Sequence, residues 1–280
     1  LHVQMLNGDY DCDRFDYVLR DSAYAGVSYG EFDLNYLIEN LRVKPHPPTS
    51  SDLILAIHKR KALRTFEHYL TGRFFLYSQI IFNRQVRGFE LLVRSILHGL
   101  ARLGLAYENF EAIKQMVQTP EFLFFDDTYI VSKINDALRS DKVTGVLESM
   151  CNDLINNTLP LIVVDESYIV SEPGLPAGEY GEKRTIVMND TNLDAACSAA
   201  GVKREMVGVG ENFVAFLPIA GQMTLSEILA SPNLRDQIKY VPWLWREAND
   251  SLEFLAEDRA SLLSHMGPLK LHLLRMFLVS

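Results

Sequence analysis

Acidic side chains gather near the start of the chain at a spacing suited to metal or phosphate chemistry. Five aspartates fall within a thirteen-residue stretch: Asp9, Asp11, Asp13, Asp16 and Asp21. On a helix, Asp13, Tyr17 and Asp21 follow at i, i+4 and i+8 and therefore line one stripe. A carboxylate on this stripe can coordinate a hard or borderline metal ion, while Tyr17 and Arg14 can hydrogen-bond phosphate oxygens.

Part of this cluster also has a structural interpretation, as the acidic start of a helix. Aspartates in a first turn complement the positive end of the helix macrodipole, and this is the favoured interpretation for Asp9 and Asp11. The later acids extend past the first turn, where that benefit has faded. A DxDxD calcium loop is excluded, because Arg14 stands where such a loop needs glycine and Arg20 where it needs glutamate.

Local signals predict the elements that would position these residues. Residues 9–25 have the pattern of a helix, which Gly26 and Gly30 would end. Asp33 is the predicted N-cap of a second helix over 34–43. A short apolar run at 53–57 fits either a strand or the entry to a helix.

A long helical pattern extends from Lys59 to about Leu103, with further helices predicted over 108–118 and 127–157. Arginines at spacings of three and seven share one face of the long pattern: Arg84, Arg87 and Arg94. This face could bind nucleotide or nucleic-acid phosphates. Solvated arginines paired with Glu90 and other local acids are the favoured interpretation.

The residue composition of the sequence changes after Pro160. Runs at 161–170, 183–190 and 207–219 have the composition of strands, whereas 224–230 and 247–280 have helical patterns. The glycines of GVGENF are expected in a hairpin turn, since the segment lacks the spacing of a phosphate loop. The predicted fold class is therefore mainly α, with a helical part over 1–158 and a smaller α+β part over 159–280.

Composition limits the function classes. The 280 residues carry 27 basic and 36 acidic side chains, a net charge of −9, which argues against nucleic acid or an anionic membrane as a partner. No signal-peptide pattern or membrane-spanning stretch is visible. Three scattered cysteines do not form a disulfide framework, so a reducing cytoplasm is expected. Because the chain starts at Leu1, directly before its chemically richest segment, we expect it to be the C-terminal piece of a longer protein.

Residues 11–33, DCDRFDYVLRDSAYAGVSYGEFD, resemble the DxDRxDYxxRDxxxxGxxxGxxD stretch of HD-domain phosphohydrolases, specifically the branch similar to deoxynucleoside triphosphate triphosphohydrolases. The resemblance continues through 62–93 and, less closely, through 122–138 and 146–160. It covers about 150 residues in total. It implies the C-terminal portion of an all-helical HD domain, a deoxynucleoside triphosphate as substrate, and a homo-oligomer.

The same resemblance implies roles for individual residues. Asp13 would be the last metal ligand of an H…HD…D set that binds a divalent ion, whether manganese, magnesium, iron or zinc. Arg14 would contact substrate phosphate, and Tyr17 and Asp21 would line the nucleotide pocket. Arg73, in the LTGRFF segment, would reach phosphate.

Departures from the family pattern favour an alternative. No HD dipeptide occurs in the chain, so the other metal ligands would lie upstream and the chain alone should be inactive. Ile81 and Phe82 stand where relatives often carry a tyrosine pair, and NNTLP at 156–160 replaces a basic run. The alternative is a non-catalytic nucleotide-sensing or subunit-assembly module on the same scaffold.

Overall fold

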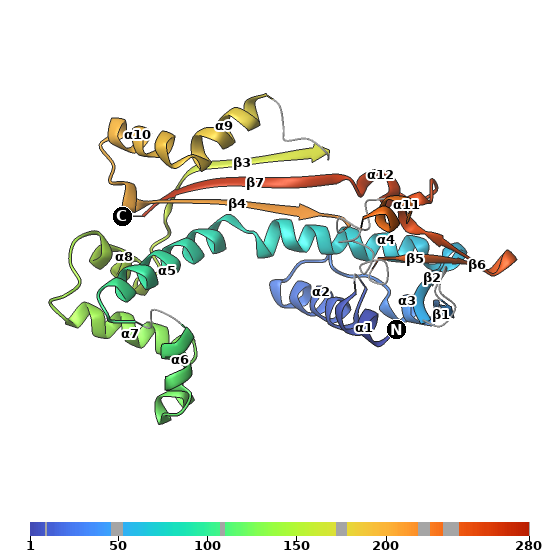
Figure 1. The fold of residues 1–280 in the computed structure, drawn as a ribbon, viewed down its shortest axis with the longest axis horizontal. Helices are drawn as coiled ribbons and strands as arrows, with labels where there is room; N and C mark the ends of the chain where they lie inside the picture. The colour runs from blue at the N-terminus through green and yellow to red at the C-terminus, as the bar shows by residue number, and fades with distance from the viewer. Residues whose placement is uncertain are drawn as a thin grey trace. The chain divides into compact units, whose positions relative to one another are not determined.

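The computed structural model describes residues 1–8, 10–45, 53–106, 110–171, 178–217, 225–231 and 241–279. The chain forms two compact units, each made of three segments (Figure 1). Unit 1 comprises Leu1–Phe82, Tyr168–Pro176 and Phe213–His272; unit 2 comprises Asn83–Ser167, Ala177–Asn212 and Leu273–Ser280. The expected division of the sequence near residue 158 stays a prediction.

Helices hold most of the N-terminal part of unit 1. Their bounds are α1 (His2–Asn7), α2 (Cys12–Ala25), α3 (Leu34–Glu39) and α4 (Lys59–Leu76), followed by a π turn, η1 (Tyr77–Ile81). Shorter elements later in this unit are α11 (Leu225–Ala230), η6 (Glu247–Asn249), η7 (Leu255–Glu257) and α12 (Leu263–Met266). The predicted helix at 224–230 is confirmed by α11.

A four-stranded sheet lies in the same unit, in the order β1-β2-β5-β6. Its strands are β1 (Leu41–Pro45), β2 (Leu53–His58), β5 (Trp243–Arg246) and β6 (Ser251–Phe254). The β2–β5 pair is parallel and the other two pairs are antiparallel. The run at 53–57 is therefore a strand, and the predicted helix over 34–43 ends early because Leu41 pairs with Ile57. These strands correct the expectation that the first part of the chain is all-helical.

Aromatic side chains fill the core between α2 and α4. The ring centres of Phe15 and Tyr69 lie 4.8 Å apart with an interplanar angle of 74°. Those of Tyr10 and Phe66 lie 5.6 Å apart at 82°. Tyr10 also donates a hydrogen bond to the carbonyl of Leu55 at 2.6 Å, which ties β2 to this core. Edge-to-face contacts of this kind add directional preference to the burial of apolar surface. The position of α2 against α4 is thus fixed by packing.

Unit 2 is built around α5. Its helices and helical turns before residue 207 are α5 (Arg84–Arg102), α6 (Phe110–Met116), η2 (Pro120–Phe124), α7 (Asp127–Arg139), α8 (Val146–Ile155), α9 (Glu179–Met188), α10 (Asp190–Ala200) and η3 (Arg204–Met206). Leu92, Ile96 and Leu100 of α5 are fully buried and pack with Ile134 and Met150. The helical spacing of these residues explains why α5 forms and which side it buries.

Three longer strands, β3 (Leu161–Ser171), β4 (Val207–Ala215) and β7 (Leu269–Leu278), form a second sheet in the order β3-β7-β4. The strand predicted at 161–170 is confirmed. The hairpin turn expected at GVGENF is wrong, because β4 passes straight through it. The helix expected over 247–280 is also wrong beyond the short α12: a continuous apolar run does not distinguish a helix from a central strand, and β7 takes the central place.

The strand expected at 183–190 is wrong as well, since this stretch lies in α9 and α10. Tyr180 and Arg184, one helical turn apart in α9, both hydrogen-bond Glu211, at 2.7 and 2.8 Å. Lys183 also pairs with Glu179 at 3.0 Å. These i and i+4 ties hold a helix despite the β-branched residues at 185–187, so tertiary contacts override local propensity.

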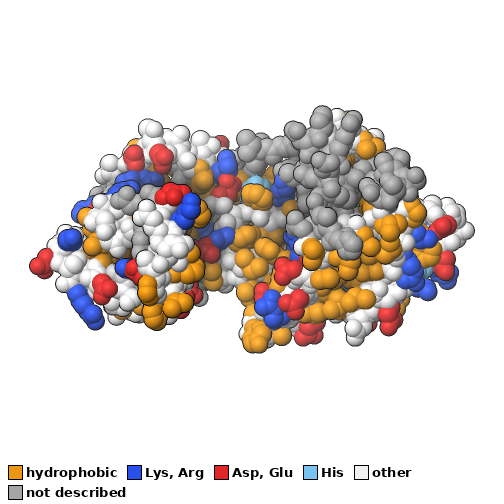
Figure 2. Space-filling view, turned by 60° about the horizontal axis from the view of Figure 1, so that its bottom comes forward, with side chains coloured by type: hydrophobic (Ala, Val, Ile, Leu, Met, Phe, Trp, Pro, Cys, Tyr) orange, Lys and Arg blue, Asp and Glu red, His pale blue; other side chains and the backbone are white. Residues whose placement is uncertain are grey.

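Hydrophobic side chains are exposed on unit 1. Figure 2 shows them over a broad area in the region of α1 to α3, where Leu6 and Ile38 are 77% and 51% exposed. A pocket of about 640 Å³ opens there between Met5, Leu19 and Ile38. Among the helices that the structure describes, none is long and apolar enough to cross a bilayer.

Two glycines allow the turn after α2 to approach its neighbours closely. Gly26 ends α2 in the left-handed region at φ +69°, with its N–H donating to the carbonyl of Ala23. Gly72, in the middle of α4, has no room for a side chain, because a Cβ there would stand 2.4 Å from the carbonyl oxygen of Tyr29. The backbone of α4 therefore touches the turn that follows α2, immediately before Arg73.

We predict that Gly72→Ala lowers the free energy of unfolding by about 1–3 kcal/mol, because backbone rather than a flexible side chain must move. Gly99→Ala is the matched control: it also lies inside a helix, but its Cβ would meet the methyl groups of Leu147, which can rotate away. Chemical denaturation of both variants measures the difference. Equal losses would contradict the close approach at Tyr29.

Candidate functional site

Helix α2 presents the predicted stripe. Asp11 is its N-cap, accepting a hydrogen bond from the backbone N–H of Arg14 at 2.7 Å, and so stands one position before the helix and not inside its first turn as expected. Asp9 lies outside the described residues. Phe15 and Val18 face the core, while Asp13 is exposed and Tyr17 is half-buried. The predicted helix is therefore confirmed, beginning at Cys12.

The carboxylates of α2 differ in their partners. Asp16 forms an i, i+4 ion pair with Arg20 at 3.0 Å, on the exposed side of the helix. Within the part of the chain that the structure describes, the carboxylates of Asp13 and Asp21 have no hydrogen bond or ion pair. Their charges are thus available to a ligand, whereas that of Asp16 is partly balanced.

An arginine and two tyrosines join α2 to the end of α4. Arg73 donates from Nε to the hydroxyl of Tyr17 at 3.3 Å, and the hydroxyls of Tyr17 and Tyr77 lie 3.2 Å apart. The guanidinium carbon of Arg73 stands 5.4 Å from the centre of the Tyr77 ring, a cation–π distance. We call these three residues the Arg73 cluster. It brings together two of the predicted site residues, Tyr17 and Arg73, which are 56 positions apart.

Tyr17 keeps its proton in this cluster. Burial, together with the hydrogen bond to Tyr77, raises its pKa from 10.0 to about 12, and the positive charge of Arg73 offsets only part of this. At neutral pH the side chain is therefore a phenol that can donate or accept a hydrogen bond. It is not a base in this geometry.

Arg14 faces the start of its own helix. Its Nη1 donates to the carbonyl oxygen of Gly8 and lies 3.8 Å from the carboxylate of Asp11. These contacts orient the guanidinium along α2, one turn before Tyr17. The predicted phosphate contact of Arg14 stays a prediction.

Tyr77 was not among the residues predicted from the sequence. It begins the π turn η1, in which the N–H of Phe82 reaches the carbonyl of Tyr77 at 2.8 Å, and its ring packs against Phe82 at 5.8 Å. Short π turns inside long helices are frequent at functional sites. The i+4 spacing from Arg73 could have indicated this tyrosine, because such residues are neighbours on a helix.

A complete metal site is not formed by the described residues. No group of three or more His, Cys, Asp or Glu side chains among them gathers closely enough to hold an ion. Asp13 offers one carboxylate, whereas protein metal sites use several ligands. The described residues therefore supply one ligand of a metal site and not a complete set.

No family model matches the chain, whereas individual proteins resemble it in sequence or in fold. It is 24% identical to the uncharacterized protein YwfO of Bacillus subtilis over 165 residues, 56% of this chain and 36% of that protein. It is also 24% identical to the uncharacterized protein MJ1154 of Methanocaldococcus jannaschii over 136 residues, 48% of this chain and 29% of that protein. The chain thus spans about a third of the length of these curated relatives.

Solved structures with the same fold include a phosphohydrolase. This protein, from Bacteroides thetaiotaomicron, is 18% identical and superposes over 97% of the chain and 62% of its own length, with a TM-score of 0.56. A hypothetical protein from Aquifex aeolicus is 19% identical and superposes over 98% of the chain and 55% of its own, with a TM-score of 0.60. The fold is therefore shared with a phosphohydrolase, and it is rich in helices with an α+β region.

We predict that Tyr17 makes stability depend on alkaline pH. Because its pKa in the folded state lies above the ordinary value, the folded chain retains a proton that the unfolded chain loses, and stability falls as the pH rises from 10 to 12. In Tyr17→Phe this fall should be shallower. Denaturant unfolding at several pH values measures it, with the 89%-exposed Tyr24, changed to Phe, as the control; identical slopes in all three proteins would contradict the prediction.

Proposed function

We propose that this chain forms the phosphate- and sugar-facing wall of a nucleotide phosphohydrolase site. The substrate class is a deoxynucleoside triphosphate, and the reaction adds water across the bond between the 5′ oxygen and the α-phosphorus, releasing deoxynucleoside and triphosphate. The proposal rests on the Arg73 cluster together with the motif that carries Asp13, Arg14, Tyr17 and Asp21. The fold shared with a phosphohydrolase supports it.

The Arg73 cluster is suited to binding a phosphate oxygen. The hydrogen bond to Tyr17 and the ring of Tyr77 hold the guanidinium in one orientation. A pre-oriented arginine loses less rotamer freedom when it pairs with an anion, and charge-assisted hydrogen bonds are the strong ones. Tyr17, protonated at neutral pH, adds a hydroxyl close to the same place. In this arrangement Asp21, one turn further along α2, faces the sugar.

Asp13 would act as one ligand of a divalent metal, with the other ligands supplied from outside this chain. Its exposed carboxylate, without a described partner, is free to take that role. When bound, such an ion neutralises phosphate charge and acidifies a water. The cytoplasm, with its nucleotide pools, is the compartment that this activity requires.

The decisive experiment compares two aspartates of α2 in the protein encoded by the complete reading frame. With Mn²⁺ and each deoxynucleoside triphosphate, we predict release of triphosphate, and a fall in kcat of at least about 100-fold in Asp13→Ala, since a metal ligand is lost. Asp16→Ala is the matched control and should keep its activity, because Asp16 is paired with Arg20 on the exposed side. Equal activities of the two variants, or no hydrolysis by the parent, would refute the proposal.

Arg73 gives a second prediction for the same site. Arg73→Gln removes the charge but keeps a hydrogen-bonding amide, so KM for the nucleotide should rise about tenfold, the usual cost of one charge-assisted hydrogen bond. Steady-state kinetics with Arg20→Gln as the control measure it. Unchanged kinetics in Arg73→Gln would separate the cluster from substrate binding.

A subunit-assembly or nucleotide-sensing module is the second candidate function. The exposed apolar area over α1 to α3 favours it, because contiguous apolar surface of this kind marks interaction sites. Ile38→Asp would then dissociate a homo-oligomer in light scattering. Calorimetric binding of nucleotide without turnover by the protein from the complete reading frame would support this candidate over the enzyme.

A further inference from the structure

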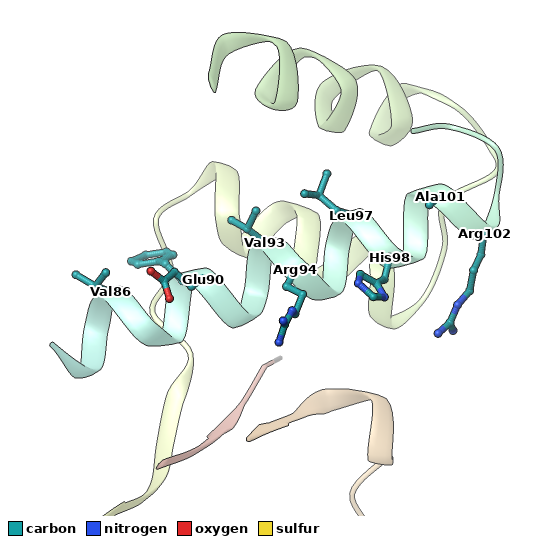
Figure 3. Close-up of a pocket in the computed structure, with 9 residues that line it drawn as sticks. Val86, Glu90, Val93, Arg94, Leu97, His98, Ala101 and Arg102 are labelled. Carbon is teal, nitrogen blue, oxygen red and sulfur yellow. The ribbon is translucent and has the colours of Figure 1, made fainter. Parts of the chain in front are cut away.

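The arginines of α5 differ in their partners. Arg84 lies 3.7 Å from Asp165, and Arg87 is paired with Glu90 as expected, although the Arg87 side chain is only 23% exposed. Arg94 is different, because no side-chain hydrogen bond or ion pair to it occurs within the described residues. Figure 3 shows Arg94, His98 and Arg102 extending from the same side of α5, at i, i+4 and i+8.

This side of α5 forms one wall of a pocket of about 550 Å³ that lies wholly within unit 2. Lys142 and Thr144, from the loop before α8, line a second part of it, and Arg204 of η3 lines a third. The pocket has the size of ordinary small-molecule sites. Its cations therefore come from three separate segments of the chain and converge on one hollow.

Most of the positive charge of this pocket is unbalanced. Arg94, Arg102 and Lys142 have no ion pair with any residue that the structure describes. Arg204 pairs with Asp190 and Asp194, at 3.1 and 3.2 Å, and these two carboxylates balance its charge. Glu205 is the single acidic residue among the described residues that line the pocket. The chain as a whole has a net charge of −9, so this local excess of positive charge differs from the rest of the molecule. A bound anion would neutralise it.

We propose that this pocket binds a small molecule through a chain of two or three phosphates. Several cations from three segments match an anion with several charged oxygens better than they match a single phosphate, and guanidinium groups pair with phosphate oxygens through two parallel hydrogen bonds. The hydroxyls of Ser95 and Thr144 in the lining add neutral donors. The site uses none of the residues of the Arg73 cluster, so it is independent of the proposed function.

Calorimetry with inorganic tripolyphosphate, in EDTA to remove divalent metals, tests the proposal on the 280-residue chain. Arg102→Ala with Lys142→Ala should weaken binding at least about tenfold, because two charged partners are lost. Lys114→Ala with Arg139→Ala is the matched control: it removes the same charge from exposed i, i+3 pairs elsewhere in unit 2 and should bind as the parent does. All four side chains are exposed, so melting temperatures should stay unchanged.

Two further measurements distinguish this pocket from the Arg73 cluster and from a nucleic-acid surface. Binding of tripolyphosphate that is weakened in the pocket variant and retained in Arg73→Gln supports the proposal. It would be overturned by no binding of tripolyphosphate, by equal weakening in the pocket and control variants, or by weakening in Arg73→Gln alone. Preference of the pocket for a single-stranded oligonucleotide over tripolyphosphate would also overturn it.

Discussion

The contact between α4 and the turn after α2 is the constraint on which the candidate site depends. At Gly72 the two backbones meet so closely that only a hydrogen atom fits on the Cα, and the rings of Phe15 and Tyr69 pack in the core that α2 and α4 share. This contact fixes the position of Arg73 on α4 relative to Tyr17 on α2. The hydrogen bond between them is thus a consequence of backbone packing, since neither side chain could hold two helices together by itself.

The two arginine-bearing sites illustrate two ways of arranging positive charge. In the Arg73 cluster a single guanidinium is fixed by phenols, which orient it without neutralising it. In the unit 2 pocket several cations from different segments face one hollow, and among its described cations only Arg204 is tied to acids. A single charge held in one orientation can select a ligand by its geometry. A group of separate charges instead increases the affinity for a multiply charged chain.

Local signals in the sequence were sufficient where they decide the structure by themselves. The N-cap Asp33 and the stop at Gly26 follow from side-chain and backbone chemistry within a few residues. Local signals were insufficient where contacts with residues far away in the sequence decide the structure. The helix α9 depends on Glu211, and β7 takes its strand conformation from its two neighbours in the sheet. Tyr77 was missed because its role comes from a residue of another helix, although its spacing from Arg73 was visible.

The π turn at Tyr77–Ile81 has a consequence for how this chain can change over time. A widened turn interrupts the helical repeat, and the repeat restarts at Asn83, whose side chain caps α5 by accepting from the N–H of Gln85 at 2.9 Å. The start of α5 is therefore set by its own cap and not inherited from α4. Insertions or deletions near Tyr77 can reshape the end of α4 that carries Arg73 while the buried side of α5 keeps its register.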